Sequence, residues 1–500
     1  MHRFSIAFLI PIFLSPAFCQ YSHIPPGNIG IGGEIGDRID RTIENNLMVL
    51  DLDNDFLQPF RDKKSSGGFI GLGMLIDSAV KLAAYSGEEE VIGRKDYLID
   101  EALKTQEADG YLGMMKPESR LWSLWDIHEM SYLIAGLVTD YRLFGNERSL
   151  VAAKKIADYI IEGWSASPER KPGDGAITVY MAVTGSETAM LDLYDLTGEK
   201  RYLDYCTELR NLDEWDGPIV LGRWGPIQGH AYAYMSRCLA QIHLDQIQPS
   251  QNLVNPTRKV LHFLTEENGL VISGECGDHE CWHNTQEGTT NLGETCATAY
   301  LTRLLDRLYL TDPAPLLGDL MERSIHNGLF GAQSPDGRKI RYYTPYEVPR
   351  VYFDRDTYCC PCNYRRIMGE LPNMVYYQTE NGVLANLYTP SEATIELKDG
   401  KKVRLRQSTD YPTSGRIEFE VGLDQPETFE FAFRIPRWCE DASLIINGEE
   451  SPSGQVKSGS IHRLERTWRD GDRIRLQLAM KPRWVKGRQS QAGRVALMMG

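Results

Sequence analysis

The stretch Thr295–Leu310, with the sequence TCATAYLTRLLDRLYL, places its apolar residues three and four positions apart. This spacing gathers them on one face of an α-helix. The same period recurs in Gly73–Tyr85, Val91–Gln106, Ile127–Phe144, Ser149–Ile161, Ser186–Leu196, Lys200–Leu209, His230–Leu244, Pro256–Thr265, Ala314–Leu329 and Cys362–Tyr376. These stretches come in pairs joined by short breaks, and such helical hairpins stack on one another. We therefore predict a toroid of helix pairs, an (α/α)6 barrel, over residues 20–380, although the period alone also fits an open solenoid.

The pattern changes after Glu380 to an alternation of apolar and polar residues. Alternation of this kind predicts strands at Val383–Tyr388, Ala393–Leu397, Val403–Gln407, Arg416–Val421, Thr428–Ile435, Ser443–Ile446 and Arg473–Leu478. Asp-Gly, Ser-Gly and Asn-Gly pairs lie between several of them, as in β-hairpins. The prediction is a mainly α protein with an all-β module, a β-sandwich domain over residues 381–500. Because Val495–Gly500 reads as one more strand, we expect this domain to be truncated at its C-terminus.

Length and charge narrow the function classes. A chain of 500 residues exceeds what one hydrophobic core usually serves, so at least two domains are expected. A formal net charge of −15 disfavours nucleic acids and anionic membranes as partners, since both carry the same sign of charge. A neutral carbohydrate remains compatible with this charge, and the sequence does not indicate an oligomeric state.

The N-terminus has the pattern of a secretory signal peptide. A basic start at Met1–Arg3 precedes the apolar run Phe4–Leu14, and small residues follow at Ala17 and Cys19. We expect residues 1–19 to be removed and the mature chain to be periplasmic or secreted. No later stretch approaches the roughly 20 apolar residues that a membrane span needs.

Cysteines of exported proteins usually form disulfides. Of the nine cysteines that remain after signal cleavage, Cys276 and Cys281 are candidates for a local disulfide. The odd number leaves at least one thiol or metal ligand over.

The cysteines at 359, 360 and 362 are unusual because two of them are adjacent, in Tyr358-Cys359-Cys360-Pro361-Cys362-Asn363. Adjacent residues lie about 3.8 Å apart at Cα, below the roughly 4.4–6.8 Å that a disulfide usually spans. Together with Gly293-Glu294-Thr295-Cys296 upstream, they offer thiolates and one carboxylate, which suit a soft divalent metal in a tetrahedral site. The sequence therefore predicts a zinc site. Four protein ligands can also mean a closed, purely structural zinc site.

Both cysteine motifs resemble those of a known family. Gly293–Ala297 is similar to the "GETCA" segment, and Cys359–Asn363 to the "CCPPN" segment, of the zinc- and cysteine-dependent β-L-arabinofuranosidases of glycoside hydrolase family 127 and its relatives. The resemblance extends to His128-Glu129-Met130, Gly229-His230-Ala231 and Phe433–Trp438. It implies an (α/α)6 barrel with appended β-domains, a tetrahedral Zn²⁺ and a retaining mechanism.

Carried over by position, the resemblance implies roles for individual residues. The zinc ligands would be Glu294, Cys296, Cys359 and Cys360, with Cys359 also the nucleophile. His128, His230 and Tyr342 would bind the sugar. Two departures from the family pattern bear on sugar specificity: Cys362 replaces a more usual proline, and no histidine lies between His128 and His230.

The acid/base residue is expected in the segment that precedes Glu294. Glu280 fits the family pattern best, and Asp278, Glu275 and Glu287 are its rivals. In a retaining glycosidase this group lies roughly 5–5.5 Å from the nucleophile, and its pKa should be raised so that it carries a proton.

Other functions compete with this interpretation. The C-x-x-C at Cys359–Cys362 could be redox-active, but a thioredoxin-like motif needs a βαβ framework. A zinc deaminase is excluded because the H-x-E and P-C-x-x-C spacings are absent. A non-catalytic carbohydrate-binding or scaffold protein stays open, as does another glycosidase or a lyase that would use Arg365-Arg366. We expect an exported retaining exo-glycoside hydrolase that releases terminal furanose, with β-L-arabinofuranose as the leading candidate.

Overall fold

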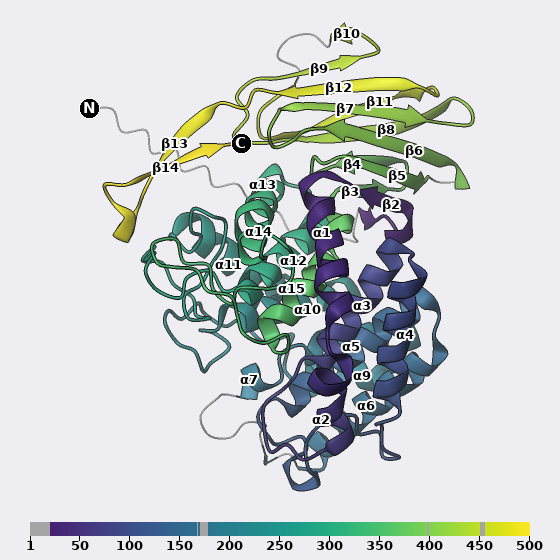
Figure 1. The fold of residues 1–500 in the computed structure, drawn as a ribbon, viewed down its shortest axis with the longest axis vertical. Coiled ribbons are helices and arrows are strands. Elements are labelled where there is room, and N and C mark those ends of the chain that lie inside the picture. The colour runs from purple at the N-terminus through teal and green to yellow at the C-terminus, as the bar shows by residue number, and fades with distance from the viewer. Residues whose placement is uncertain (1–20, 168, 171–178, 398–399, 451–455) are drawn as a thin grey trace.

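The computed structural model describes residues 21–167, 169–170, 179–397, 400–450 and 456–500, so the expected signal peptide lies outside the described residues. A helical body carries a β-module at one end (Figure 1). The helices are α1 (Gly33–Asn45), α2 (Gln58–Asp62), α3 (Leu72–Ser86), α4 (Glu89–Leu103), α5 (Asp126–Phe144), α6 (Glu147–Ser165), α7 (Val179–Ala182), α8 (Ser186–Thr197), α9 (Lys200–Asp204), α10 (Ala231–Ile247), α11 (Asn255–Glu266), α12 (Thr295–Thr311), α13 (Pro315–Arg323), α14 (Phe330–Ala332) and α15 (Cys359–Met368). In this part of the chain, no helix is both long enough and apolar enough to cross a bilayer.

The inner helices form a closed ring. Around it, α3 contacts α5, α5 contacts α8, α8 contacts α10, α10 contacts α12, α12 contacts α15, and α15 returns to α3. An outer helix packs against each member of the ring: α4, α6, α9, α11, α13 and α1, in the same order. The contact between α15 and α3 closes the circle, so the structure is an (α/α)6 barrel and not an open solenoid.

Sequence composition explains which helices lie inside. In α12 nearly every residue from Thr295 to Leu310 is buried, whereas α11 buries only one face. A helix that is buried all round belongs to a core, and an amphipathic one covers it. The close approach of α3 to α5 depends on Gly73, because a Cβ there would lie 2.1 Å from the backbone nitrogen of Leu133.

The β-module is a sandwich of two sheets. Its strands, with a separate hairpin at the end, are β1 (Ser22–His23), β2 (Ile29–Ile31), β3 (Tyr376–Thr379), β4 (Gly382–Ala385), β5 (Ser391–Glu396), β6 (Lys402–Thr409), β7 (Arg416–Gly422), β8 (Glu427–Ile435), β9 (Ala442–Ile446), β10 (Glu449–Glu450), β11 (Ser460–Trp468), β12 (Asp472–Leu478), β13 (Pro482–Lys486) and β14 (Val495–Met499). One sheet has the order β1-β3-β4-β8-β11 and the other β10-β9-β12-β7-β6-β5-β2, while β13 and β14 pair only with each other. Phe419 of β7 packs against Phe431 of β8, with ring centroids 5.2 Å apart, and so joins the two sheets.

Buried ion pairs fix the sandwich to the barrel. Arg434 of β8 is fully buried and reaches Asp319 and Glu322 of α13, at 2.6 and 2.5 Å. The Tyr411 hydroxyl donates to Glu322 as well, at 2.6 Å. Arg434, which belongs to the family-like segment Phe433–Trp438, therefore joins the domains and lies outside the cysteine site.

The structure differs from the sequence prediction at several elements. The predicted helix Cys362–Tyr376 instead begins at Cys359 and ends at Met368, and Tyr376 starts strand β3. Pro372 cannot continue a helix, because its nitrogen has no hydrogen to donate. Helices α1, α2, α7 and α14 and strands β1, β2, β3, β10, β11 and β13 were not predicted, whereas the strand expected at Val495 is β14.

Candidate active site

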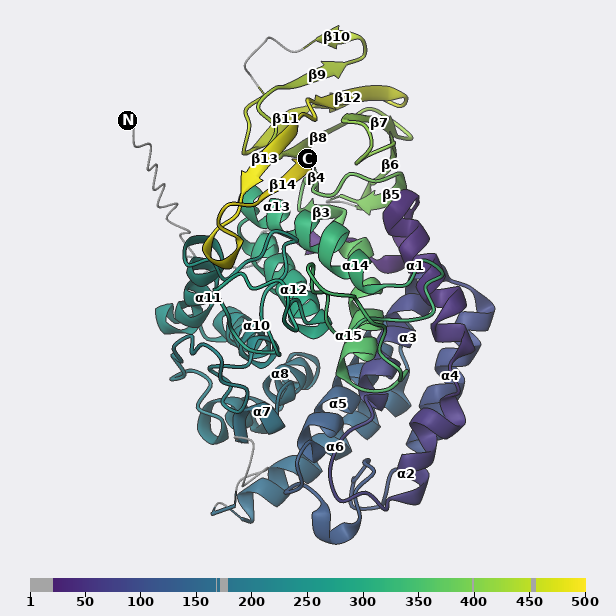
Figure 2. The ribbon, with the colours of Figure 1, turned by 60° about the vertical axis from the view of Figure 1, so that its left-hand side comes forward.

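Two neighbouring helix N-termini bring four metal-ligand side chains together. Glu294 precedes the first residue of α12, and Cys296 lies in its first turn. Cys359 and Cys360 are the first residues of α15, the next helix in the ring (Figure 2). All four side chains are buried, and their ligand atoms lie within 4.8 Å of one another. The Sγ atoms of Cys296 and Cys360 are 3.3 Å apart, and Cys360 Sγ is 3.6 Å from Glu294 Oε1. We call these four residues the thiolate cluster.

The thiolate cluster fits a zinc ion. Glu294 Oε2 is buried and has no hydrogen-bond partner within the described residues. An orphaned buried carboxylate oxygen is costly unless a cation or a donor meets it. Burial raises the pKa of Glu294, and it also raises those of Cys296 and Cys360, so these groups ionise together only around a positive charge. Three sulfurs and one oxygen form a donor set that zinc prefers.

Cys359 differs from its neighbours in charge. Burial opposes its ionisation, but hydrogen bonds from the Cys296 and Cys360 thiols outweigh burial and hold its pKa well below the ordinary value. The Tyr342 hydroxyl lies 3.2 Å from Cys359 Sγ. Tyr358, the preceding residue, has φ +86°, a conformation that a non-glycine residue rarely adopts and that clusters at functional sites. Cys359 is therefore the sulfur that most readily carries negative charge.

Glu280 is the carboxylate that the fold places beside Cys359. The Tyr342 hydroxyl donates to Glu280 Oε1 at 2.5 Å while it contacts Cys359 Sγ at 3.2 Å. One hydroxyl thus links both groups, and the carboxylate oxygen lies less than about 6 Å from the sulfur, compatible with the separation in retaining glycosidases. His279 and Glu280 both have positive φ, +48° and +68°, a conformation that non-glycine residues rarely adopt.

The pKa of Glu280 is lowered, whereas the sequence analysis expected it to be raised. Burial raises the pKa, but hydrogen bonds from His230, Tyr342 and Trp224 outweigh it, so the pKa is lowered. His230 Nε2 lies 3.4 Å from Glu280 Oε2. Since His230 Nδ1 accepts from the backbone nitrogen of Ala233, Nε2 carries the proton in the neutral ring and can donate.

The three rivals of Glu280 have other partners. Glu275 is buried and bonded to Ser273 and Thr344, and burial raises its pKa to about 7. Asp278 pairs with His279, at 2.9 Å between Oδ1 and Nδ1. Glu287 caps its own loop by accepting from Thr289. Geometry favours Glu280.

The sugar-binding candidates have different surroundings. His230 and Tyr342 both contact Glu280. His128 is buried among aromatic rings, 4.6 Å from Phe69 and 5.1 Å from Trp125 between ring centroids, and burial lowers its pKa to about 3. Its Nε2 contacts the Tyr232 hydroxyl at 3.0 Å, and its Nδ1 has no partner among the described residues. A neutral histidine with one free ring nitrogen can bind a sugar hydroxyl.

A buried hydrogen-bonded chain links His128 to the thiolate cluster. It runs from Tyr232 through the hydroxyls of Tyr132 and Tyr300 to Arg366, with spacings of 2.8, 2.5 and 3.3 Å. Arg366 then donates to Asn363 at 3.0 Å, and Asn363 donates to Cys296 Sγ at 3.3 Å. Sequence reasoning missed these tyrosines and Trp224 because no local pattern marks them; Asn363 was visible only as part of the cysteine motif.

Several alternatives lose support. None of the nine described cysteines forms a disulfide, so the candidate pair Cys276–Cys281 is wrong. Arg365 and Arg366 are buried, and Arg366 pairs with Asp77 at 2.6 Å, so neither arginine is exposed for a lyase substrate. The Cys359–Cys362 segment starts a barrel helix, and the βαβ framework of a redox motif is not found there.

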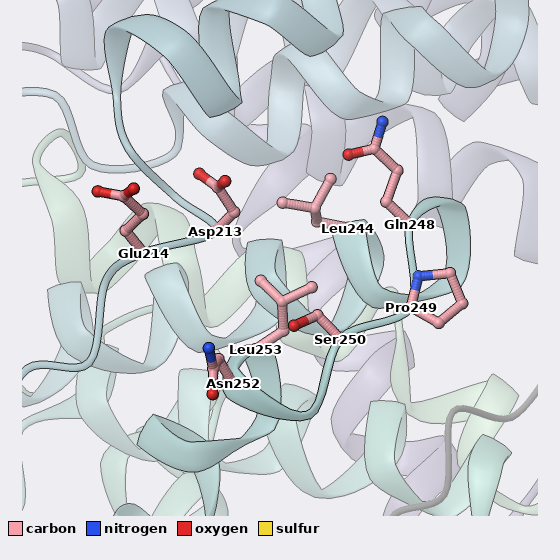
Figure 3. A pocket seen from close by; sticks show the side chains of 8 residues that line it. All are labelled: Asp213, Glu214, Leu244, Gln248, Pro249, Ser250, Asn252 and Leu253. Carbon is pink, nitrogen blue, oxygen red and sulfur yellow. The ribbon is translucent and has the colours of Figure 1, made fainter.

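An open hollow of about 490 Å³ lies at the C-terminal end of α10. Its lining comes from the end of α10 and the loops beside it: Asp213, Glu214, Leu244, Gln248, Pro249, Ser250, Asn252 and Leu253 (Figure 3). These side chains offer two carboxylates and small polar groups on an open surface, and none of them contacts the thiolate cluster.

Comparisons with known proteins agree with this fold. The family model of the β-L-arabinofuranosidase GH127 catalytic domain matches residues 33–373, and that of the GH127 middle domain matches residues 382–480. The non-reducing end β-L-arabinofuranosidase of Bifidobacterium longum subsp. longum is 24% identical over 492 residues, which cover 85% of this chain and 73% of the relative.

Two solved structures share the fold. A GH127 β-arabinofuranosidase superposes with a TM-score of 0.80 at 22% identity, covering 97% of this chain and 85% of that one. The GH127 β-L-arabinofuranosidase of Geobacillus stearothermophilus T6 gives 0.78 at 22% identity, covering 95% and 85%. Because the family models match most of its length, this chain belongs to the GH127 β-L-arabinofuranosidase family and is a glycoside hydrolase.

Proposed function

We propose that this chain is a retaining exo-glycoside hydrolase that removes terminal β-L-arabinofuranose, with Cys359 as nucleophile and Glu280 as acid/base. The observation that carries the proposal is the Tyr342 hydroxyl, which contacts Cys359 Sγ and Glu280 Oε1 at once. The choice of sugar is supported by the relative from Bifidobacterium longum, which is a non-reducing end β-L-arabinofuranosidase.

The first half of the reaction transfers the sugar to sulfur. Cys359 Sγ attacks the anomeric carbon, a C–S bond forms and the C–O bond to the leaving group breaks. Glu280 gives its proton to the departing oxygen. A leaving-group oxygen between Glu280 and Cys359 takes the place of the Tyr342 hydroxyl, and the loss of that donor raises the pKa of the Glu280 carboxyl toward the protonated form.

The second half releases the sugar. Glu280, now a carboxylate, takes a proton from water as the water oxygen attacks the anomeric carbon and the C–S bond breaks. Cys359 returns as a thiolate and Glu280 as an acid, so protons and electrons balance over the cycle. Two inversions at the anomeric carbon give net retention.

The proposal includes a zinc ion bound by the thiolate cluster. Glu294, Cys296, Cys359 and Cys360 would hold it, and when bound it supplies the positive charge that keeps three neighbouring thiolates deprotonated. His128 and His230 would orient the sugar by hydrogen bonds to its hydroxyls. Removal of residues 1–19 and export to the periplasm or the medium belong to the proposal as well.

A second candidate is a closed zinc site that only ties α12 to α15 in a carbohydrate-binding protein without catalysis. It is favoured by one observation: all four ligands come from the protein, as in structural zinc sites.

Two substitutions decide between these candidates. Cys359→Ser should lower turnover of aryl β-L-arabinofuranosides by more than about 10³-fold, since the nucleophile is lost. Glu280→Gln should spare aryl substrates, whose leaving groups need no proton, far more than natural ones. Cys439→Ser, at a buried thiol of the β-module, is the matched control and should keep full activity. Wild-type turnover by Cys359→Ser, or no hydrolysis of arabinofuranosides by the native protein, would reject the proposal.

A further inference from the structure

The hairpin of β13 and β14 reaches from the β-module to the barrel. Its two strands pair only with each other, and the hairpin extends along the helical body (Figure 1, Figure 2). The turn between the strands, residues 487–494, contains the short 3-10 helix Gln489–Gln491. Gly487 donates from its backbone to the carbonyl oxygen of Arg494 at 2.9 Å, and a Cβ on Gly487 would lie 2.0 Å from the carbonyl oxygen of Gln491. We call residues 487–494 the hairpin tip, which is compact and held together by its own backbone.

The hairpin tip contacts the loop that carries the candidate acid/base. The backbone nitrogen of Ser490 donates to the carbonyl oxygen of Thr285 at 3.0 Å. Gln491 Nε2 donates to the carbonyl oxygen of Gln286 at 3.2 Å. Thr285 and Gln286 lie five and six residues after Glu280. Two hydrogen bonds from the hairpin tip therefore hold the stretch of chain that leads away from Glu280.

The hairpin tip also contacts the segment that carries Tyr342. Arg494 Nη1 lies 2.5 Å from Glu347 Oε1, and Gln491 Nε2 donates to the same carboxylate oxygen. Glu347 lies five residues after Tyr342, and its backbone nitrogen donates to the carbonyl oxygen of Gly288 at 3.0 Å. Gln491 thus bonds to both segments at once, and Arg494 fixes the second of them by an ion pair.

The two segments carry the residues whose contact defines the candidate site. The Tyr342 hydroxyl donates to Glu280 Oε1 at 2.5 Å and lies 3.2 Å from Cys359 Sγ. Closer to the site, the backbone nitrogen of Thr344 donates to the carbonyl oxygen of Leu292 at 2.9 Å, so the segments run side by side. Because a displacement of about 1 Å can cost about 10²-fold in rate, contacts that hold the two segments together can affect proton transfer without touching the substrate.

We infer that the hairpin tip aligns Glu280 with Tyr342, and that Gln491 and Arg494 are its positioning residues. The inference rests on the function proposed above and gives the β-module a part in acid catalysis. Proton transfer requires the acid within hydrogen-bond reach of the departing oxygen. Loss of the tip contacts should therefore slow substrates whose leaving group needs a proton more than substrates whose leaving group departs unaided.

The test compares two substrates that differ in their need for a proton. Initial rates are measured for methyl β-L-arabinofuranoside, which needs it, and for the 4-nitrophenyl glycoside, which needs it little. The double variant Gln491→Ala/Arg494→Ala should lower the ratio of kcat/KM for the methyl glycoside to kcat/KM for the nitrophenyl glycoside by about three- to tenfold, the combined size of two exposed polar contacts. For the methyl glycoside the loss should fall on kcat, since the tip does not bind substrate. Arg494→Lys keeps the charge and should keep the ratio within about twofold.

A control variant and the wild type make each outcome decisive. Arg475→Ala removes an exposed ion pair within the sandwich, with Glu418 at 2.8 Å, and should leave both rates unchanged. The zinc content and melting temperature of each variant show whether it is folded. If wild-type protein hydrolyses neither substrate, the proposed function fails. If it hydrolyses both and the double variant lowers both rates equally or not at all, or if Arg475→Ala lowers the ratio as much, the positioning role is rejected while the function stands. Wild-type protein that cleaves only the nitrophenyl glycoside has no working acid, which also rejects the positioning role.

Discussion

Two groups of potential metal ligands in the described part of the barrel have opposite environments. The thiolate cluster is wholly buried. Asp192, Asp195 and His243 also bring their ligand atoms within 4.8 Å of one another, but His243 alone is buried. We call these three residues the carboxylate–histidine group. Arg142 Nη1 lies 2.7 Å from Asp192 Oδ1, and His243 Nε2 lies 2.7 Å from Asp195 Oδ2.

The difference lies in where the counter-charge comes from. In the carboxylate–histidine group a guanidinium and an imidazole from the chain itself contact the carboxylates. In the thiolate cluster, Glu294 Oε2 has no hydrogen-bond partner among the described residues, and the neutral amide of Asn363 is what reaches Cys296. Buried acidic groups are stable when they are paired or coordinate a metal. Proximity of acidic side chains alone therefore does not predict a metal site, whereas proximity with a missing cation does.

The largest expected effect that tests this contrast is on zinc binding. We expect one zinc per chain, and we expect Cys296→Ala to lower zinc affinity by more than about 10³-fold, because a thiolate ligand is lost from a site worth about 10–16 kcal/mol. His243→Ala should keep the full zinc content. Elemental analysis of reduced protein and competition with a chelator measure both. Two zincs per chain, or loss of zinc on His243→Ala alone, would contradict the distinction.

Local pattern was enough to predict most helices and strands and to draw attention to the cysteines of the thiolate cluster. The helix Thr295–Leu310 follows from its period, and Cys359–Cys360 attract attention because adjacent cysteines rarely pair. Local pattern could not predict that the ring closes. Closure depends on the contact between α15 and α3, which lie at opposite ends of the barrel sequence. Short strands such as β1 and β2 have too few residues to show an alternation. They pair with β3 and β5, which lie more than 300 residues later in the chain.

The candidate site shows the same limit. Glu280 could be chosen only through the family resemblance, because three other candidate carboxylates lie close to it in the sequence. What singles it out is Tyr342, sixty-two residues later, whose hydroxyl bridges to Cys359. Trp224 carries no sequence signal at all, since its role depends on a loop that brings it beside Glu280. Three-dimensional contacts between distant segments decide these roles.

A smaller effect on zinc binding is expected from Asn363, which contacts a candidate zinc ligand. It is the amide that donates to Cys296 Sγ while Arg366 holds its carbonyl oxygen. Partners behind metal ligands usually contribute about 10–100-fold to affinity, so Asn363→Ala should weaken zinc binding by that amount. Chelator competition measures it. Asn386→Ala, at a buried asparagine of the β-module, is the matched control; an equal loss there would point to general destabilisation instead.

The smallest expected effect tests whether the carboxylate–histidine group is an ion-pair network. Burial raises the pKa of Asp195, but the hydrogen bond from His243 and the charges of His243 and Arg142 outweigh it, so the pKa is lowered below 3.8. A carboxyl with a depressed folded pKa stabilises the fold above its unfolded pKa, and this contribution is lost as the pH falls through the folded value. Asp195 is 40% exposed, so solvent screening limits the contribution of its ion pairs to about 0.5–1 kcal/mol.

Asp195→Asn should therefore lower the free energy of unfolding at pH 7 by about that amount, and the difference from the wild type should fade below about pH 4. Urea unfolding at pH 7 and pH 3.5 measures it, with Asp424→Asn, at an exposed pair with Arg404, as the control that should change little. Added zinc should not restore the lost stability, because the ion pairs within the chain already satisfy these carboxylates. If added zinc raised the free energy of unfolding of the wild type more than that of Asp195→Asn, the carboxylate–histidine group would be a second metal site. The contrast with the thiolate cluster would then be lost.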